Sequence, residues 1–288
     1  MKGKLLMKLN EAVSFSKLNI NKSITTPLDL QGFSQYKAPL VGIEVEVENV
    51  AQIGNLRPAH SWRVENDGSL RNGGVEYISH PTEPKDVESI ITYLYDDIIP
   101  KEAHFSPRTS VHVHMNCRNL TFKQIYNIVL TYQCFEDLLY DFAGSERKKS
   151  IFCVPVGNTN YYLHLKEHLD QADCPPWHKY TGLNLGPLRE YGTIEFRHLR
   201  GTRNKQTIYT WLHYLYTMYN FAINIDTAEL EKLIKDVSFN HNFFDLGYKV
   251  FGNRFLELVR NSVYQKKMRE DLAISKLFMA ETQLKGWQ

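Results

Sequence analysis

The stretch Val41 to Val50 reads V-G-I-E-V-E-V-E-N-V and alternates apolar with acidic residues. In a β-strand successive side chains point to opposite faces, so one face of this stretch would be apolar. That face would consist of Ile43, Val45 and Val47. The other face would carry three carboxylates, roughly 7 Å apart at about 3.3 Å of rise per residue. They belong to Glu44, Glu46 and Glu48.

No lysine or arginine interrupts this acidic face. Carboxylates at such a spacing repel one another unless a positive group lies over them. Mg²⁺ or Mn²⁺ would satisfy them, because hard cations prefer oxygen ligands. The alternative is a half-buried strand whose acidic face is solvated and binds nothing.

The composition limits the classes of partner. The chain has 288 residues, of which 43% are hydrophobic and 23% charged, so it can bury a sizeable core. The formal net charge of +2 gives no broad electrostatic reason to expect a nucleic-acid partner. No apolar run reaches the roughly 18 residues that a membrane span needs, so we expect no membrane partner.

The cysteines and the N-terminal stretch bear on the compartment. The four cysteines include no C-x-x-C pair, which is the spacing of many zinc and redox sites. The opening stretch M-K-G-K-L-L-M-K-L-N has too short and too interrupted an apolar part for a signal peptide. We therefore expect reduced, mostly buried thiols in a cytoplasmic protein.

Further strands with one polar face follow the acidic strand. They are predicted around Trp62 and Val64, and at Val75–Ser79, Thr109–Asn116 and Tyr191–Leu199. An Asp67-Gly68 turn follows the first of them. The polar faces would carry Glu76, the pair His112 and His114, and the pair Glu195 and Arg197. His198 would face the opposite way, with Ile194 and Phe196.

Helices are predicted between and after these strands. They run from Thr82 to about Ile98, from Thr121 to about Ala143 and from Asn204 to about Ile223, and another begins at Asp226. Residues 145–150 form a short basic run that we interpret as a solvated loop. Residues 151–180 contain several prolines and are predicted to form a long loop. Loops of this length are usually functional or mobile.

The order of strands and helices predicts an α+β fold. In this fold an antiparallel sheet would be covered by helices on its outer face. Residues 1–38 are expected to form an N-terminal arm, and residues 39–225 the main domain. Residues 226–288 are expected to form a helical C-terminal region packed on the same domain.

The polar faces together suggest one site. If they share a concavity, it contains several carboxylates, two imidazoles and at least one guanidinium. The acids then need cations and the arginine needs an anion, and two divalent metal ions with a nucleotide polyphosphate would satisfy both. Taken singly, each group has a simpler explanation: a structural histidine pair, a Glu195–Arg197 ion pair, an ordinary Asp67-Gly68 turn and an exposed Glu76.

The order of these motifs resembles that of a known family. The motifs are G-I-E-V-E at 42–46, D-G-S-L at 67–70, G-V-E-Y-I-S-H-P at 74–81, S-V-H-V-H at 110–114, L-N-L at 183–185 and G-T-I-E-F-R-H-L-R-G-T at 192–202. The set resembles the amidoligase family, which belongs to the carboxylate–amine ligase superfamily typified by glutamine synthetase and glutamate–cysteine ligase. The resemblance covers roughly residues 40–225.

The resemblance implies a glutamine-synthetase-like sheet that binds ATP and two or three Mg²⁺ or Mn²⁺ ions. Glu44 and Glu46 would then bind different metals. The further metal ligands would be Glu76, His112 and Glu195. The groups beside the nucleotide would be His114, Arg197 and Arg200, with Arg197 also catalytic. Asp67 and Ser69 would be catalytic groups on the substrate side, and Glu48 receives no role from the resemblance.

The expected function is that of an ATP-dependent carboxylate–amine ligase, which forms an amide or isopeptide bond through an acyl phosphate. Phosphoryl transfer needs metals and arginines that neutralise charge rather than a covalent nucleophile. The chain has no G-x-x-x-x-G-K-[ST] loop, so the sheet itself would hold ATP. The expected substrates are a carboxylate and an amine from an amino acid, a peptide or a cell-wall fragment. The alternatives are a two-metal phosphoesterase or nuclease, and a non-catalytic binding protein that kept the fold.

Overall fold

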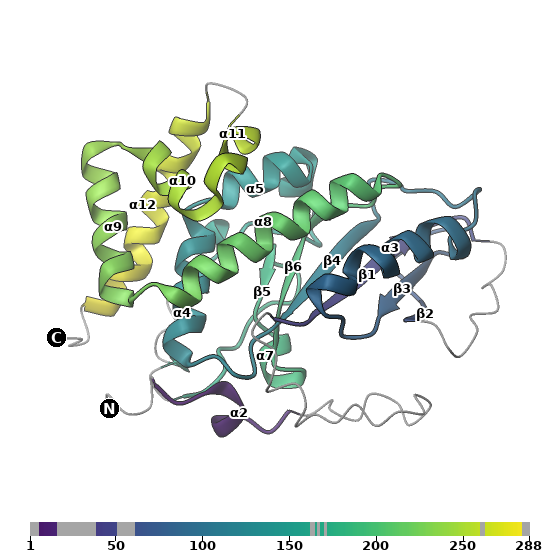
Figure 1. The fold of residues 1–288 in the computed structure, drawn as a ribbon, viewed down its shortest axis with the longest axis horizontal. Coiled ribbons are helices and arrows are strands. Elements are labelled where there is room, and N and C mark those ends of the chain that lie inside the picture. The colour runs from purple at the N-terminus through teal and green to yellow at the C-terminus, as the bar shows by residue number, and fades with distance from the viewer. Residues whose placement is uncertain are drawn as a thin grey trace.

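The protein is described from a computed structural model, which covers residues 6–15, 39–50, 61–161, 165, 168–169, 172–259 and 263–283. Within these residues the chain forms one open six-stranded sheet in the order β2-β3-β1-β4-β6-β5, and all neighbouring strands are antiparallel (Figure 1). The strands are β1 Val41–Val47, β2 Trp62–Asn66, β3 Val75–Ser79, β4 Ser110–Asn116, β5 Leu183–Asn184 and β6 Thr193–Arg200. The α+β prediction with an antiparallel sheet is therefore confirmed.

The acidic strand β1 lies inside the sheet, between β3 and β4. Its apolar residues Ile43, Val45 and Val47 are fully buried, as the alternation predicts. Burying side chains of this size contributes about 1.5–3 kcal/mol each, so the apolar face fixes which way the carboxylates point. A register slip of one residue would turn all of these valines and the isoleucine out of the core.

Strand β6 contains a bulge that changes its alternation. Against β4, Phe196 pairs with Val113 and Leu199 pairs with Val111, so Arg197 and His198 together oppose one residue. His198 and Leu199 are consequently both fully buried on the helix side. Because of the bulge, Arg200 is opposite Ser110 and lies on the polar face. Strict alternation would have placed it on the apolar face instead.

Helices cover the apolar face of the sheet (Figure 1). They are α3 Val87–Tyr93, α4 Phe122–Gln133, α5 Glu136–Ala143 and α8 Lys205–Asn224. A 3₁₀ turn at Pro84–Asp86 precedes α3 and a π-helical turn at Leu94–Ile98 follows it, so the helix predicted up to about Ile98 is confirmed in extent. Asn204 caps α8 as expected, because its side chain accepts from the backbone N–H groups of Gln206 and Thr207.

The single helix predicted from Thr121 to Ala143 is wrong in one respect: α4 and α5 are separate helices. The Thr121 capping box and the end at Gly144 are as expected. The break falls at Cys134 and Phe135, where the φ angle of Phe135 is −132°. Neither residue is a helix breaker, so the break follows from packing: the Phe135 ring lies edge-on to Phe251, with centroids 4.9 Å apart.

The C-terminal helices pack on the same helical layer. They are α9 Thr227–Asn240, α10 Phe243–Phe251, α11 Phe255–Leu258 and α12 Tyr264–Gln283. Helix α12 contacts α4 and α5, and α10 contacts α8. Asp226 caps α9 through the backbone N–H of Ala228, as its sequence position predicts. The short elements are α2 Leu9–Ala12, α7 Pro187–Glu190 and the 3₁₀ turns η4 Ser145–Lys149, η5 Val156–Asn158 and η6 Gly252–Arg254.

Part of the predicted N-terminal arm packs against the domain. Leu9 of α2 is fully buried, and its backbone N–H donates to the carbonyl of Leu120 at 2.9 Å. The rest of the arm, residues 1–5 and 16–38, lies outside the described residues.

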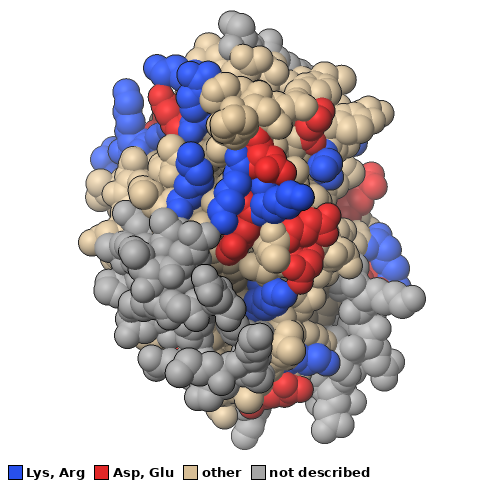
Figure 2. All heavy atoms as spheres, turned by 90° about the vertical axis from the view of Figure 1, so that its left-hand side faces the viewer, with Lys and Arg blue, Asp and Glu red and all other residues tan. Residues whose placement is uncertain are grey.

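The structure also tests the predictions made from composition for the cysteines and for membrane-spanning segments. All four cysteines are free and buried, as expected. In the described part of the chain, no helix combines the length and the apolar character needed to cross a membrane. Figure 2 shows the side of the molecule on which α9 and α12 lie, and over its described residues basic and acidic side chains are interspersed.

Candidate metal and phosphate site

The polar face of the sheet brings together the acids and histidines predicted from the sequence. The strand register places Glu44 opposite His112, Glu46 opposite Glu76, and His114 opposite Glu195. Opposite residues in antiparallel strands have their Cβ atoms about 4.5–5.5 Å apart, so four strands contribute side chains to one cluster. We call the side chains of Glu44, Glu46, Glu76, His112, His114 and Glu195 the carboxylate–histidine cluster.

Glu44 is at the centre of this cluster. Its Oε1 lies 3.2 Å from His114 Nε2, and its Oε2 lies 3.1 Å from His112 Nδ1. Two groups of three possible ligand atoms result, and within each group the atoms lie within 4.8 Å of one another. The groups are Glu44, His114 and Glu195, and Glu44, Glu76 and His112. Glu44 is therefore shared by two adjacent places where a cation would find ligands.

Glu46 lies at the side of the cluster, outside both three-ligand groups. Its Oε2 accepts from the backbone N–H and the hydroxyl of Ser110, at 2.8 and 2.7 Å. Its Oε1 is 3.7 Å from His112 Nε2. Whether Glu46 binds a metal of its own stays a prediction.

Burial excludes the alternative of a solvated acidic face. Glu46 and Glu48 are each only 5% exposed. Glu48, the third acid of the alternating stretch, accepts a hydrogen bond from the backbone N–H of Arg71 at 2.9 Å and lies outside both three-ligand groups.

The carboxylates crowd one another electrostatically. Burial raises the pKa of Glu76 to about 10, and repulsion from Glu44 and Glu46 acts in the same direction. Burial also acts to raise the pKa of Glu44, but His114 and His112 outweigh it and hold that pKa well below its usual value. Burial acts to lower the pKa of His114, but Glu44 outweighs it and the pKa is raised. Without a cation, Glu76 is therefore protonated near neutral pH, and the raised pKa of His114 favours its protonated form.

Hydrogen bonds fix the imidazole rings. His114 Nδ1 bonds with the hydroxyl of Thr193 at 3.0 Å, which leaves Nε2 directed at Glu44. His112 Nε2 bonds with the hydroxyl of Ser110 at 2.7 Å, which leaves Nδ1 directed at the carboxylates. Partners of this kind orient histidines that bind metals.

Arg197 lies beside the cluster, on the same strand face as Glu195. Its Nη1 forms an ion pair with Glu195 Oε1, and the side chain is 15% exposed. The other oxygen of Glu195 accepts from Asn184 Nδ2 at 2.6 Å. Arg197 Nε donates to the carbonyl of Phe152 at 3.5 Å, and its guanidinium lies 6.0 Å from the ring centroid of Tyr180. The predicted strand pair is confirmed, and it places a cation directly against a candidate metal ligand.

The remaining predicted residues lie at the rim. Arg200 is opposite Ser110 in the register, is 60% exposed and pairs with Glu146 at 3.4 Å. Asp67 Oδ1 accepts from the backbone N–H of Ser69 at 2.7 Å, which is an Asx turn. Asp67 is near enough to Glu76 to raise its pKa further, whereas Ser69 is exposed.

Sequence reasoning missed Arg147. The prediction of a solvated loop at residues 145–150 is wrong for this residue, which is only 2% exposed. The segment forms the 3₁₀ turn η4, and the Arg147 guanidinium donates to backbone carbonyls of β6. A run of basic residues gives no local signal for this burial, because it depends on contacts with a strand about 50 residues away.

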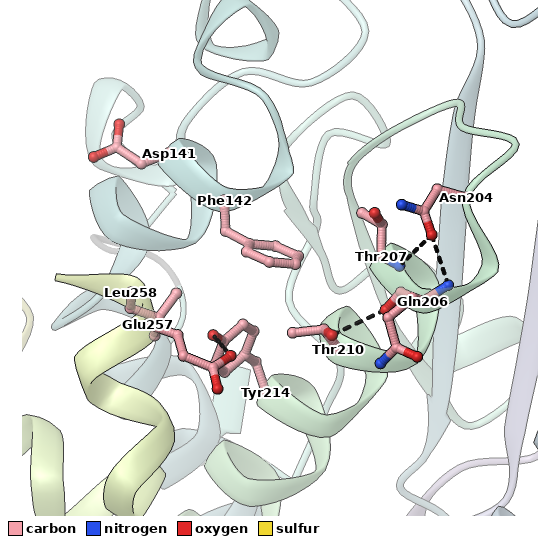
Figure 3. Close-up of a pocket in the computed structure, with 9 residues that line it drawn as sticks. All are labelled: Asp141, Phe142, Asn204, Gln206, Thr207, Thr210, Tyr214, Glu257 and Leu258. Atoms are coloured by element: carbon pink, nitrogen blue, oxygen red, sulfur yellow. Dashed lines mark hydrogen bonds between the residues drawn. The ribbon is translucent and has the colours of Figure 1, made fainter. Parts of the chain in front are cut away.

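A hollow lies on the helix side of the sheet, away from the cluster. A cleft of about 380 Å³ opens between α5, α8 and α11 (Figure 3). Many of its polar atoms already bond within the protein: Asn204 caps α8, Thr210 donates to the Gln206 carbonyl, and Tyr214 donates to Glu257. Asp141 forms an ion pair with Lys267. Several polar groups of the cleft are therefore already engaged within the protein.

Comparison of the chain with protein-family models and with curated protein sequences gives no match.

Proposed function

We propose that the chain is an ATP-dependent carboxylate–amine ligase that works with Mg²⁺ or Mn²⁺. One observation carries this proposal: two adjacent three-ligand groups share Glu44, and Arg197 is paired with a ligand of one of them. Phosphoryl transfer from ATP needs this combination of cation ligands and an arginine at the phosphate.

The donor set fits divalent cations of the hard or borderline class. Carboxylate oxygens suit Mg²⁺, and mixed carboxylate and imidazole donors suit Mn²⁺. The residues that would hold the ions are those of the two groups: Glu44, Glu76 and His112, and Glu44, His114 and Glu195. When bound, the cations would neutralise charge on the phosphate oxygens of the nucleotide.

The chain's own residues would then act on the anions. Arg197 would bind the γ-phosphoryl oxygens and stabilise their charge during transfer. A substrate carboxylate oxygen would attack the γ-phosphorus, and the bond from that phosphorus to the β-bridging oxygen would break, which gives an acyl phosphate and ADP. An amine nitrogen would attack the acyl carbon, and inorganic phosphate and one proton would leave. Asp67, near Glu76 at the rim, would lie on the substrate side and is the carboxylate we propose to accept that proton.

The test separates this proposal from its alternatives. We expect ADP release from ATP with a mixture of amino-acid and peptide carboxylates, and hydroxylamine should trap the acyl phosphate as a hydroxamate in equal amount. A phosphoesterase or nuclease would hydrolyse its substrate whether or not an amine is present, and a binding protein would release no ADP. Nucleotide hydrolysis that yields no hydroxamate with any carboxylate would contradict the ligase proposal.

Metal affinity should depend on pH because of Glu76. Its carboxyl group, with a pKa of about 10, is protonated near neutral pH in the metal-free protein. Cation binding needs the ionised form, so binding should release a proton and strengthen as pH rises from about 6 to about 8. Loss of the proton from His114 acts in the same direction. Calorimetric Mn²⁺ titrations in two buffers of different ionisation enthalpy measure the release, which should fall in Glu76→Gln; an affinity that is independent of pH would contradict it.

A further inference from the structure

The two arginines of the proposed phosphate site lie at the β6 bulge and shortly after it. Arg197 is the first residue of the bulge, and Arg200 follows it by three positions. At a bulge the ladder is locally disrupted, so the carbonyls there need partners other than the neighbouring strand. The direction of the Arg197 side chain depends on how this irregular backbone is held.

Side chains from the helices that cover the sheet hold His198, the second residue of the bulge. His198 Nε2 bonds with the hydroxyl of Tyr132 at 2.7 Å, and that hydroxyl donates to Glu136 Oε1 at 2.6 Å. All three side chains are buried. This chain of hydrogen bonds fixes the His198 side chain but contacts neither carbonyl of the bulge.

Arg147 holds both carbonyls. Its Nη2 donates to the carbonyl of Arg197 at 3.0 Å, and its Nε donates to the carbonyl of His198 at 3.1 Å. One planar guanidinium therefore spans the two consecutive carbonyls of the bulge, which a lysine ammonium would not do with the same geometry. The Cys153 thiol adds a weaker bond to the Arg197 carbonyl at 3.3 Å.

The burial of Arg147 is costly for the fold. It is 2% exposed, and among the residues that the structure describes no carboxylate forms an ion pair with it; its neighbour Glu146 pairs with Arg200 instead. A buried cation without an anionic partner is destabilising relative to an apolar side chain of similar size. A polar but uncharged side chain would also satisfy carbonyl oxygens, so structure alone gives a weak reason for an arginine here.

We propose that Arg147 is a positioning residue for Arg197: by holding the two carbonyls of the bulge, it sets the Arg197 guanidinium against the phosphate site. This inference rests on the proposed function, because Arg197 is the group that would contact the transferring phosphoryl. Arg147 itself bonds to the backbone of β6, and we assign it no contact with substrate.

A double-mutant cycle tests the inference. Arg147→Lys should lower kcat for ADP release about tenfold to hundredfold, with KM for ATP within about threefold of wild type. In an Arg197→Lys background the same change should lower kcat by less than about twofold, because a residue that acts through another adds nothing once that partner is gone. Arg203→Lys is the matched control, since Arg203 also donates to a backbone carbonyl, that of Ala103 at 2.7 Å. Its kcat should stay close to wild type.

Two outcomes would overturn the inference. If the kcat effects of Arg147→Lys and Arg197→Lys multiply, Arg147 makes an independent, merely structural contribution. If kcat is normal in Arg147→Lys, Arg147 makes no contribution to turnover. If Arg147→Lys fails to fold, Arg147→Gln replaces it in the cycle, because its amide can still donate to one of the two carbonyls.

A measurement without activity separates this inference from the proposed function. The Arg197 Nε–H resonance, assigned by its absence in Arg197→Lys, should exchange with solvent at least about tenfold faster in Arg147→Lys than in wild type. If wild-type protein releases no ADP, the proposed function is contradicted. The exchange rate still decides whether Arg147 positions Arg197. An unchanged rate would overturn the inference.

Discussion

Replacing Arg197 with lysine is expected to lower turnover roughly a hundredfold or more, while the protein stays folded and still binds Mg²⁺. Arg197 is held against Glu195, a candidate metal ligand. A cation beside a metal ion is repelled unless anions lie between them; the Glu195 carboxylate is one such anion, and the transferring phosphoryl group would be a second. Lysine keeps the charge but loses the planar, two-pronged donor geometry that suits phosphate oxygens.

The competing explanation is that Arg197 only neutralises Glu195. Lysine would preserve such an ion pair, so near-normal turnover in Arg197→Lys would leave Arg197 a structural partner. Coupled ADP release and a melting curve for each protein are the measurements. Arg189→Lys is the matched control, because Arg189 also pairs with a carboxylate, Asp173 at 2.7 Å, but lies on α7, outside the cluster.

The strands and their faces could be predicted because the signal is local. Strict alternation with one apolar face predicts both the strand and the side on which each residue lies. Strand β3 matches its predicted span, Val75–Ser79, and the polar faces of β1 and β4 are as expected. The histidine pair and the Glu195–Arg197 pair lie together for the same reason.

The features that could not be predicted depend on contacts between distant segments. The break between α4 and α5 has no helix-breaking residue to mark it. The bulge at Arg197 and His198 is an irregularity of pairing with β4, which the sequence of β6 alone does not reveal. Arg147 lies in a run of charged residues, and only its bonds to β6 explain its burial.

The cluster itself was predicted as a set of residues but not as an arrangement. The resemblance implied that Glu44 and Glu46 bind different metals. The register places Glu44 opposite His112, and its carboxylate also lies beside His114, so Glu44 belongs to both three-ligand groups, while Glu46 bonds with Ser110. That the two acids bind different metals stays a prediction. Such details depend on which strands are neighbours in the sheet, and the sequence of a single strand does not predict its neighbours.

Glu44→Gln is expected to weaken Mn²⁺ binding at least about a hundredfold, because the change removes a charged ligand from both groups at once. The amide keeps the size of the side chain, so the fold should survive. Glu48→Gln is the matched control. Glu48 lies on the same acidic face, immediately after β1, and is as buried as Glu46. It lies outside both groups and bonds with the backbone of Arg71.

The most direct test of the metal and nucleotide site is Mn²⁺ binding, followed by electron paramagnetic resonance in the presence of a non-hydrolysable ATP analogue. Wild type and Glu48→Gln should each bind Mn²⁺ with similar affinity, with one ion for each three-ligand group, and the analogue should tighten binding. Glu44→Gln should have lost this binding. Equal Mn²⁺ affinity in all three proteins would show that the carboxylate–histidine cluster holds no metal, and the proposed phosphoryl-transfer site would be contradicted with it.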